Sequence, residues 1–371
     1  MKELLDFEAF REGPEAEGLV RRVRELVDGP TALMEVCGTH TVAIGRAGIR
    51  SLVPEELRLL SGPGCPVCVT PLGEIDQTIE AARRPDVTVA TFGDMMRVPG
   101  SESSLERERA AGADVRVVTS ALDAVKLASE EPSREIVFIG VGFETTSPTV
   151  AAALLEAERR DVPNVSVFPF FKLVPPALEF LVGVPDRALD GFLCPGHVSS
   201  IIGSNAYEPV AREAGIPCVV TGFEPLDILA GIVMLLEQVR DVRSGGAARV
   251  ETQYSRAVRP EGNPTARSLL DETFDTADAE WRGIGAIPAS GYVLSQDLMH
   301  RDAAAKLGIE RPEPAEPEGC ICGAIMLGRK LPGDCPLFGT DCTPRDPVGP
   351  CMVSSEGSCA AHFRYEHRRS T

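Results

Sequence analysis

The sequence predicts an α/β protein with two small parallel-sheet domains of similar fold and an irregular C-terminal domain. Between residues 14 and 221, short apolar runs alternate with longer helical patterns, as they do in βαβ units. From residue 311 the composition changes, and prolines lead into a tail with few large apolar residues. Six of the eleven cysteines lie in this tail. We therefore expect domains at residues 1–131, 132–245 and 246–371.

Eight short apolar runs are expected to form the strands. They span residues 32–36, 57–60, 87–91, 115–118, 136–141, 165–168, 191–193 and 218–221. Continuous apolar runs of this length, bounded by turn residues, are typical of strands that are buried on both faces of a parallel sheet. Eight strands are enough for two small sheets.

Helical periodicity separates many of these runs. The expected helices span residues 17–27, 74–83, 122–130, 149–160 and 226–240. Residues 244–248 (SGGAA) indicate a turn or linker, and the pattern is weak from there to residue 280. Because the tail has little material for an apolar core, a metal centre is the simplest account of how it folds.

Charge and composition exclude several classes of protein. The chain has 37 Lys and Arg against 55 Asp and Glu, which gives a net charge of −18. Such a surface repels a phosphate backbone, so we exclude a nucleic-acid binder. Residues 1–8 lack the basic and apolar parts of a signal peptide, and the apolar run 228–236 is too short to span a bilayer. We expect a cytoplasmic protein whose cysteines are metal ligands or redox thiols.

Four polar motifs begin where a predicted strand ends. They are residues 37–41 (CGTHT), 62–68 (GPGCPVC), 142–146 (GFETT) and 194–199 (CPGHVS). Open parallel sheets bind their ligands beyond the carboxyl ends of the strands. We expect the thiols and the histidine of the first two motifs to meet on one rim, with Glu144 and His197 facing them across a cleft.

The thiols of the first two motifs indicate a soft transition metal. Cys65 and Cys68 form a C-x-x-C pair, whose spacing lets both sulfurs reach one metal or join as a disulfide. Cys37 adds a third thiolate and would leave an open coordination position for chemistry. A zinc knuckle remains an alternative, although the second close pair that a structural zinc site requires is missing. Inert buried thiols are the other alternative.

Three further polar residues have both a functional and a structural interpretation. His40 and His197 could orient or deprotonate a thiol, or bind metal, but a lone histidine is more often a satisfied core or surface residue. Glu144 is followed by Thr-Thr-Ser-Pro, which resembles the start of a helix, so it could instead be a cap. Cys194 and Cys218 stand alone and are expected in the core.

The tail contains Cys320, Cys322, Cys335, Cys342, Cys351 and Cys359. Zinc ribbons prefer two close pairs, and only the first two of these cysteines are close. Long irregular spacing between prolines favours an iron–sulfur cluster held by four thiolates, with zinc as the alternative. The spacing does not select which four cysteines bind.

With these motifs the sequence resembles the HypD family of [NiFe] hydrogenase maturation factors. The resemblance rests on the four motifs above and on the tail segments 335–339 (CPLFG), 342–344 (CTP) and 352–361 (MVSSEGSCAA), and it covers nearly the whole chain. It implies two α/β domains and a [4Fe-4S] domain. It also implies a complex with HypC that assembles the Fe(CN)2CO group, receives cyanide from HypE and serves the hydrogenase large subunit indirectly.

The resemblance also implies roles for particular residues. The thiols of the iron-assembly site would be Cys37, Cys65 and Cys68, and the cleft would be lined by His40, Glu144 and His197. The cluster ligands would be Cys322, Cys335, Cys342 and Cys359, which leaves the other two tail cysteines as accessory thiols. A free-standing iron–sulfur thiol–disulfide reductase is the competing function, and a zinc-stabilised adaptor is a third.

Overall fold

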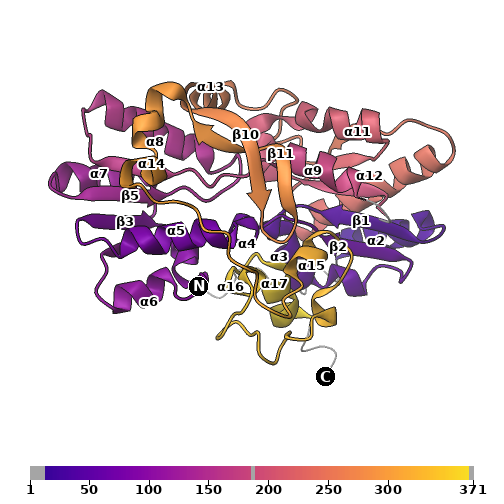
Figure 1. The fold of residues 1–371 in the computed structure, drawn as a ribbon. Coiled ribbons are helices and arrows are strands. Elements are labelled where there is room, and N and C mark those ends of the chain that lie inside the picture. The colour runs from indigo at the N-terminus through magenta and orange to yellow at the C-terminus, as the bar shows by residue number, and fades with distance from the viewer. Residues whose placement is uncertain (1–12, 185–188, 367–371) are drawn as a thin grey trace.

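The computed structural model describes residues 13–184 and 189–366, so residues 1–8, used above to judge a signal peptide, lie outside it. The described chain contains two parallel sheets, here called sheet A and sheet B, and one antiparallel hairpin (Figure 1). The α/β class predicted from the sequence is confirmed. No helix in the described part of the chain combines the length and the apolarity needed to cross a membrane.

Sheet A has five strands. Their order is β2 (Leu57–Ser61), β1 (Thr31–Glu35), β7 (Gly191–Pro195), β8 (Cys218–Thr221) and β9 (Val250–Thr252). Alternate side chains face opposite sides of the sheet. On one side, Leu33, Leu193 and Val219 pack against α2 (Pro14–Leu26) and α12 (Pro225–Arg243). The other side contributes to a larger core that both sheets share.

Sheet B has four strands. Their order is β4 (Val115–Val117), β3 (Val87–Thr91), β5 (Glu135–Ile139) and β6 (Val165–Phe168). One face is covered by α7 (Ala121–Glu130), α8 (Ser147–Arg159) and α13 (Pro264–Thr273). The opposite face packs against α5 (Leu72–Ala82) and α6 (Leu105–Ala110) within the shared core. The two halves of the molecule therefore pack as one apolar interior.

All eight expected strands and all five expected helices are present, with ends that shift by at most three residues. Their grouping into sheets differs from their order in the chain. β1 pairs with β2 and with β7, so sheet A takes strands from before and after all four strands of sheet B. The expected boundary between residues 131 and 132 falls between α7 and β5, both of which belong to the sheet B half, and β9 lies in the expected third domain.

Several elements were not expected from the sequence. The most prominent is the hairpin of β10 (Phe274–Trp281) and β11 (Gly285–Leu294), which lies between the two sheets in Figure 1. Additional helices directly follow strands of either sheet or lie near them: α3 (Gly38–Ala47), α4 (Pro66–Val69), α9 (Val174–Gly183), α10 (Gly196–Ile202), α11 (Glu208–Ala214) and α14 (Ala303–Leu307). Short 3-10 helices span Ile49–Ser51, Gly93–Arg97, Ser204–Tyr207, Gln296–Arg301 and Pro332–Asp334.

The cysteine-rich tail is irregular, as expected. Its helices are short: α15 (Cys322–Met326), α16 (Pro350–Val353) and α17 (Ser358–Tyr365). α16 packs against α4, and α17 packs against α3 (Figure 1). These two partner helices begin within the two cysteine motifs of the N-terminal region, residues 37–41 and 62–68. The tail therefore lies directly against those motifs.

Candidate functional site

The site lies at the carboxyl edge of sheet A, between two neighbouring strands. The chain leaves β1 towards β2 on one side and leaves β7 towards β8 on the other, so the strand order reverses between β1 and β7. Such a switch point leaves a crevice in which α/β proteins bind ligands. Cys37 follows β1, and His197 follows β7. Two of the predicted motifs therefore meet where this fold class places its sites.

Cys37 occupies the N-cap position of α3. Its backbone N–H donates to Oε2 of Glu35, at 3.1 Å, which fixes the turn between strand and helix. The pKa of the Cys37 thiol is raised to about 12, chiefly by burial and to a smaller extent by the carboxylates of Glu35 and Glu356, against the lowering effect of the N–H groups at the start of α3. A cation must offset these effects before a thiolate can form at neutral pH.

The C-x-x-C pair is oxidised in the structure, with a disulfide between Cys65 and Cys68. Cys65 caps α4, and its Sγ accepts the backbone N–H of Cys68 at 3.2 Å. The preceding glycine brings this loop to Cys37. Gly64 O accepts from Gly38 N at 2.8 Å, and a Cβ on Gly64 would overlap the backbone of Cys37. The structure thus brings the first two motifs together.

Both site histidines lie against Phe223, whose ring is 5.0 Å from the ring of His40 and 3.8 Å from that of His197, centre to centre. His40 is buried, and its Nε2 lies 2.9 Å from Gly222 O. Desolvation lowers the pKa of His40 to about 4. Desolvation also lowers the pKa of His197, against the opposing effect of Glu356. Both imidazoles are therefore neutral at physiological pH.

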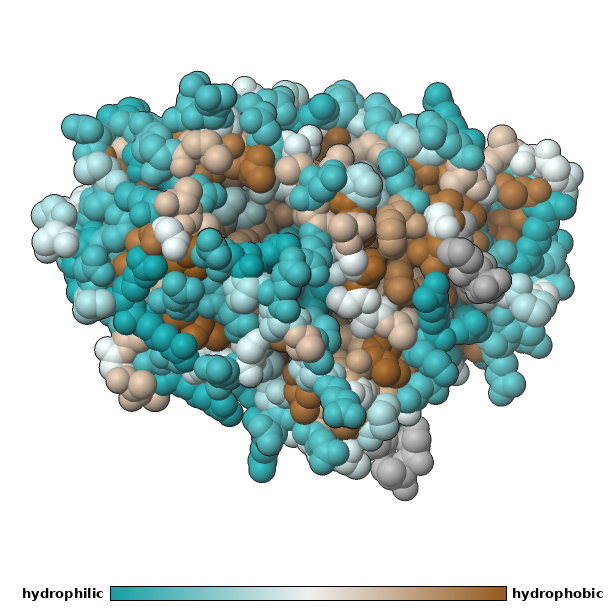
Figure 2. Space-filling model, viewed as in Figure 1, coloured by the Kyte–Doolittle hydropathy of each residue, from teal (hydrophilic) through white to brown (hydrophobic). Residues whose placement is uncertain are grey.

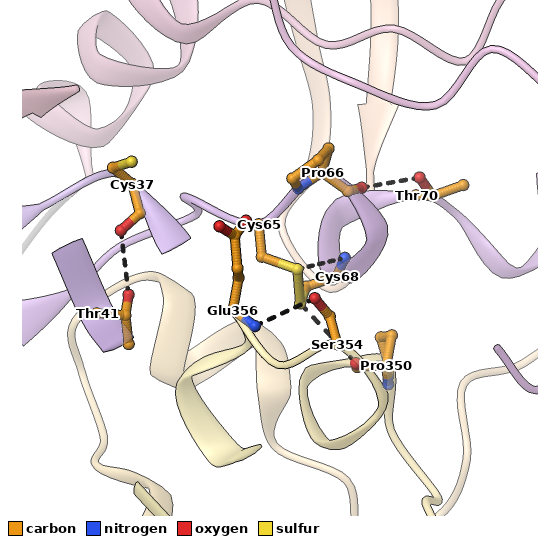
Figure 3. The surroundings of a disulfide bond; sticks show 9 residues. All are labelled: Cys37, Thr41, Cys65, Pro66, Cys68, Thr70, Pro350, Ser354 and Glu356. Atoms are coloured by element: carbon orange, nitrogen blue, oxygen red, sulfur yellow. Dashed lines mark hydrogen bonds between the residues drawn. A yellow bond between two sulfur atoms is a disulfide. The ribbon is translucent and has the colours of Figure 1, made fainter. Parts of the chain in front are cut away.

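Glu356 is a site residue that sequence reasoning missed. Its Oε1 accepts the hydroxyl of Thr39 at 2.8 Å, and its side chain lies against Gly38. Figure 3 shows Glu356 between Cys37 and the Cys65–Cys68 disulfide. It belongs to the tail segment MVSSEGSCAA, which we had interpreted only through its cysteine. Its contact with α3 links the tail to the start of that helix.

Glu144 lies beyond the end of β5 (Glu135–Ile139), beside the start of α9. Its Oε1 accepts the backbone N–H of Val174, at 2.9 Å, so it caps α9 and not α8, the helix that follows it in the sequence. Its Oε2 is buried and has no hydrogen-bond partner among the described residues. Burial raises the pKa of Glu144 to about 7. The negative charge of Glu144 contributes to raising the pKa values of Tyr207 and Tyr292.

The tail thiols gather around Cys322. Its Sγ lies 3.3 Å from that of Cys320, and hydrogen bonds from the thiols of Cys320, Cys351 and Cys359 lower the pKa of Cys322 well below its ordinary value. Cys342 Sγ accepts the backbone N–H of Val348 at 3.4 Å, and Cys335 Sγ lies 3.9 Å from Gly319 O. Both are close enough to this group to raise the pKa values of Cys359 and Cys320, respectively.

These tail residues fit a [4Fe-4S] cluster in the type and number of their donors, because such a cluster takes four thiolates and six cysteines lie within one small region. Among the described residues, no three His, Cys, Asp or Glu side chains are already placed to hold a single metal ion. Cys322 and the three thiols that contact it overlap only in part with the set implied by the resemblance, Cys322, Cys335, Cys342 and Cys359.

The remaining cysteines lie in the core, as expected. Cys194 and Cys218 are fully buried on the neighbouring strands β7 and β8. A hydrogen bond joins their thiols. This pair therefore contributes to the packing of sheet A.

Comparison with known proteins identifies the family. A family model called HypD, described as the hydrogenase formation hypA family, matches residues 15–366. The chain belongs to the HypD family. Hydrogenase maturation factor HypD2 of Bradyrhizobium diazoefficiens is 45% identical over 366 residues, which cover 96% of this chain and 95% of the relative. HypD of Escherichia coli K12 is 45% identical over 342 residues, or 92% and 91% of the two chains.

HypD of Azotobacter vinelandii is also 45% identical, over 369 residues that cover 97% of this chain and 96% of the relative. The similarity thus includes both sheets and the cysteine-rich tail. The resemblance to HypD proteins that the motifs indicated is confirmed.

Proposed function

We propose that this chain is a hydrogenase maturation factor that, together with HypC, forms the scaffold on which the Fe(CN)2CO group of [NiFe] hydrogenase is assembled. The observation that carries the proposal is the position of Cys37 at the switch point of sheet A, beside the C-x-x-C loop. The names of its HypD relatives support the maturation role. In this scheme HypE donates the cyanide ligands, and the hydrogenase large subunit receives the product indirectly.

The iron is the cargo of this site, held by Cys37 and by one thiol of the C-x-x-C pair. Iron that carries cyanide and CO is soft and favours thiolate partners. Both cysteines of the pair are almost completely buried, at 5% and 1% exposed, so bulk water has little access to the cargo. A terminal cysteine of HypC would supply a further ligand.

The disulfide must first be opened, which takes two electrons and two protons and yields two thiols. A [4Fe-4S] cluster held by the tail cysteines would relay these electrons one at a time from an external reductant. The tail is well placed for this role, because Pro350 O lies 3.9 Å from Cys68 Sγ and the next residue is Cys351. The two protons come from solvent, and the neutral imidazoles of His40 and His197 can relay them to the sulfur atoms. Glu144, whose pKa is about 7, can pass on a proton in the same way beside the start of α9.

A free-standing thiol–disulfide reductase is the second candidate function. It would need its C-x-x-C pair at the surface, where another protein can reach the sulfur atoms. The burial of Cys65 and Cys68 counts against that requirement. A zinc-stabilised adaptor would leave the C-x-x-C disulfide beside Cys37 without a role.

The metal content tests the cofactor. Protein purified without oxygen should be brown and contain about four irons and four sulfides per chain. The complex with HypC should show infrared bands of CO and cyanide. A colourless protein that contains one zinc would contradict the redox mechanism and would favour the zinc-stabilised adaptor.

Substitution tests the thiols directly. In cells that lack their own HypD protein, Cys37→Ala or Cys65→Ala should abolish the maturation of hydrogenase, because the iron loses a ligand. Cys218→Ala is the matched control, since it removes a buried thiol of sheet A that lies outside the site. If the Cys37→Ala protein still yields mature hydrogenase, the assignment is wrong.

A further inference from the structure

The contacts of His40 define which of its ring nitrogens carries the hydrogen. Nε2 lies 2.9 Å from Gly222 O and 3.3 Å from Thr221 O. A carbonyl oxygen can only accept, so Nε2 must donate. A hydrogen on Nδ1 would have no acceptor among the described residues, so the ring carries its single hydrogen on Nε2 and its lone pair on Nδ1.

Nδ1 of His40 is buried and has no hydrogen-bond partner among the residues that the structure describes. A buried acceptor without a partner is costly and rare in proteins. Metal-binding histidines characteristically donate one ring N–H to a backbone carbonyl and use the other nitrogen for the metal. His40 shows this arrangement on the helix that Cys37 caps.

The two carbonyl groups that accept the Nε2 hydrogen belong to the turn at residues 221–223, and side chains hold this turn in place. Gly222 N donates to Oε1 of Gln253 at 3.1 Å, and Gln253 Nε2 donates to Oδ1 of Asp227 at 2.8 Å. Two nitrogens of Arg256 hold the same carboxylate, at 2.9 and 2.5 Å. A Cβ on Gly222 would overlap Asp227, so the turn fits closely against this network.

We propose that Gln253 and Asp227 are positioning residues that hold the 221–223 turn and thereby fix His40 as its Nε2–H tautomer, with Nδ1 as the nitrogen that serves the thiol site. The tautomer follows from the contacts alone, whereas the role of Nδ1 rests on the proposed function. Neither Gln253 nor Asp227 is near Cys37 in the sequence. Gln253 acts on His40 through the backbone of the turn, and Asp227 acts both through this backbone and through its charge, which raises the pKa of His40.

The test is nitrogen NMR on the full-length protein labelled with 15N-histidine, with the His40 signals assigned by their loss in His40→Gln. In the wild type, Nε2 should show a directly bonded hydrogen, and Nδ1 should have the shift of an unprotonated ring nitrogen. Gln253→Met removes the two side-chain hydrogen bonds that Gln253 makes, to Gly222 N and to Asp227, and should give a mixture of tautomers. Gln238→Met is the matched control, because Gln238 is a buried glutamine that contacts Glu251 and Arg249 near the same strand.

An Nδ1–H tautomer in the wild type would overturn the proposal, as would a Gln253→Met spectrum identical to that of the wild type. If Gln253→Met fails to fold, Asp227→Asn applies the same test, since it weakens the contact with Arg256 and keeps an acceptor for Gln253. Hydrogenase maturation provides the second readout. A normal yield with Gln253→Met, despite a mixed tautomer, would show that Nδ1 has no role at the site. Because the tautomer is measured without hydrogenase, this result is distinct from a failure of the maturation function.

Discussion

Several buried titratable side chains of this protein are held in their neutral form by desolvation. Burial raises the pKa values of Cys37 and Glu144 and lowers that of His40. Charged forms of these groups have few compensating partners. The thiol of Cys37, the carboxyl group of Glu144 and the imidazole of His40 therefore add little net charge to the interior.

Glu144 should make the stability of the protein depend on pH. Its folded-state pKa of about 7 lies above its ordinary value of 4.5, so its contribution to stability is present below about pH 4.5 and is lost as the pH rises through 7. A shift of this size corresponds to about 3 kcal/mol at most. The wild type should therefore lose up to this amount of unfolding free energy between about pH 5 and about pH 8. Glu144→Gln should lose correspondingly less over the same range.

Urea denaturation of wild type and variant at the two pH values measures the effect. The substitution keeps an oxygen that can accept the N–H of Val174. The control is Glu80→Gln, at an exposed carboxylate for which no such change is expected. An equal loss of stability in wild type and Glu144→Gln would contradict the prediction.

The sequence identified the site residues that belong to strand-end motifs, and it missed those that reach the site through the tertiary fold. Cys37, His40 and His197 follow strands, so their convergence could be inferred from topology rules. Glu356 and Gln253 are polar residues of loops, and nothing in their local sequence states which distant backbone they contact. Glu144 was correctly suspected as a cap, but its helix could not be identified because α9 was not expected.

Among the elements, the two loops that carry the cysteines are in close contact, and this contact depends on glycine. Gly64→Ala should separate the loops, because the added Cβ would overlap the backbone of Cys37. We expect a loss of about 1–3 kcal/mol of stability, as is usual for overpacking, together with a reduced yield of mature hydrogenase. Thermal denaturation and hydrogenase activity in cells measure the two effects.

Gly29→Ala is the control for this substitution. Gly29 precedes β1, and a Cβ there would meet no heavy atom within 4 Å. It should leave the stability and the maturation yield nearly unchanged. If the two variants behave alike, close packing of the loops is not what holds the thiols together.

At the same scale, the strands of the sheets were predictable and the hairpin was not. The sheet strands are continuous apolar runs because both faces are covered. β10 and β11 expose many of their residues and contain Asp275, Asp278 and Glu280, so their sequence lacks this signal. The pairing of β1 with β7 could not be predicted from the sequence either, because apolar patterns identify strands and not their neighbours in a sheet.

The sheet B half of the molecule contains a buried ion pair, in which Lys172, which follows β6, reaches Glu74 in α5. Lys172 Nζ lies 3.1 Å from Oε1 of Glu74, and the two side chains are only 2% and 9% exposed. Arg311, from the segment that leads into the tail, also approaches this carboxylate. Removing one partner leaves the other charge buried, so Lys172→Met should cost about 3–5 kcal/mol.

The double substitution Lys172→Met with Glu74→Leu should be less destabilising than Lys172→Met alone, because no unpaired charge remains. Chemical denaturation of the single and double variants measures the difference. Lys126→Met provides the control, since it removes an exposed pair with Glu130 and should change stability by less than about 0.5 kcal/mol. A double variant that is less stable than Lys172→Met alone would contradict the explanation by an unpaired buried charge.

The interleaved order of the two sheets determines when the site can form during protein synthesis. β1 emerges from the ribosome early, but its partner β7 follows only after the whole of sheet B, and Glu356 follows near the end of the chain. Domains usually fold as they are completed, from the N-terminus onward. Here the first cysteine motif must wait for almost the entire polypeptide. The nascent chain therefore cannot complete the surroundings of Cys37 before the cysteine-rich tail has been made.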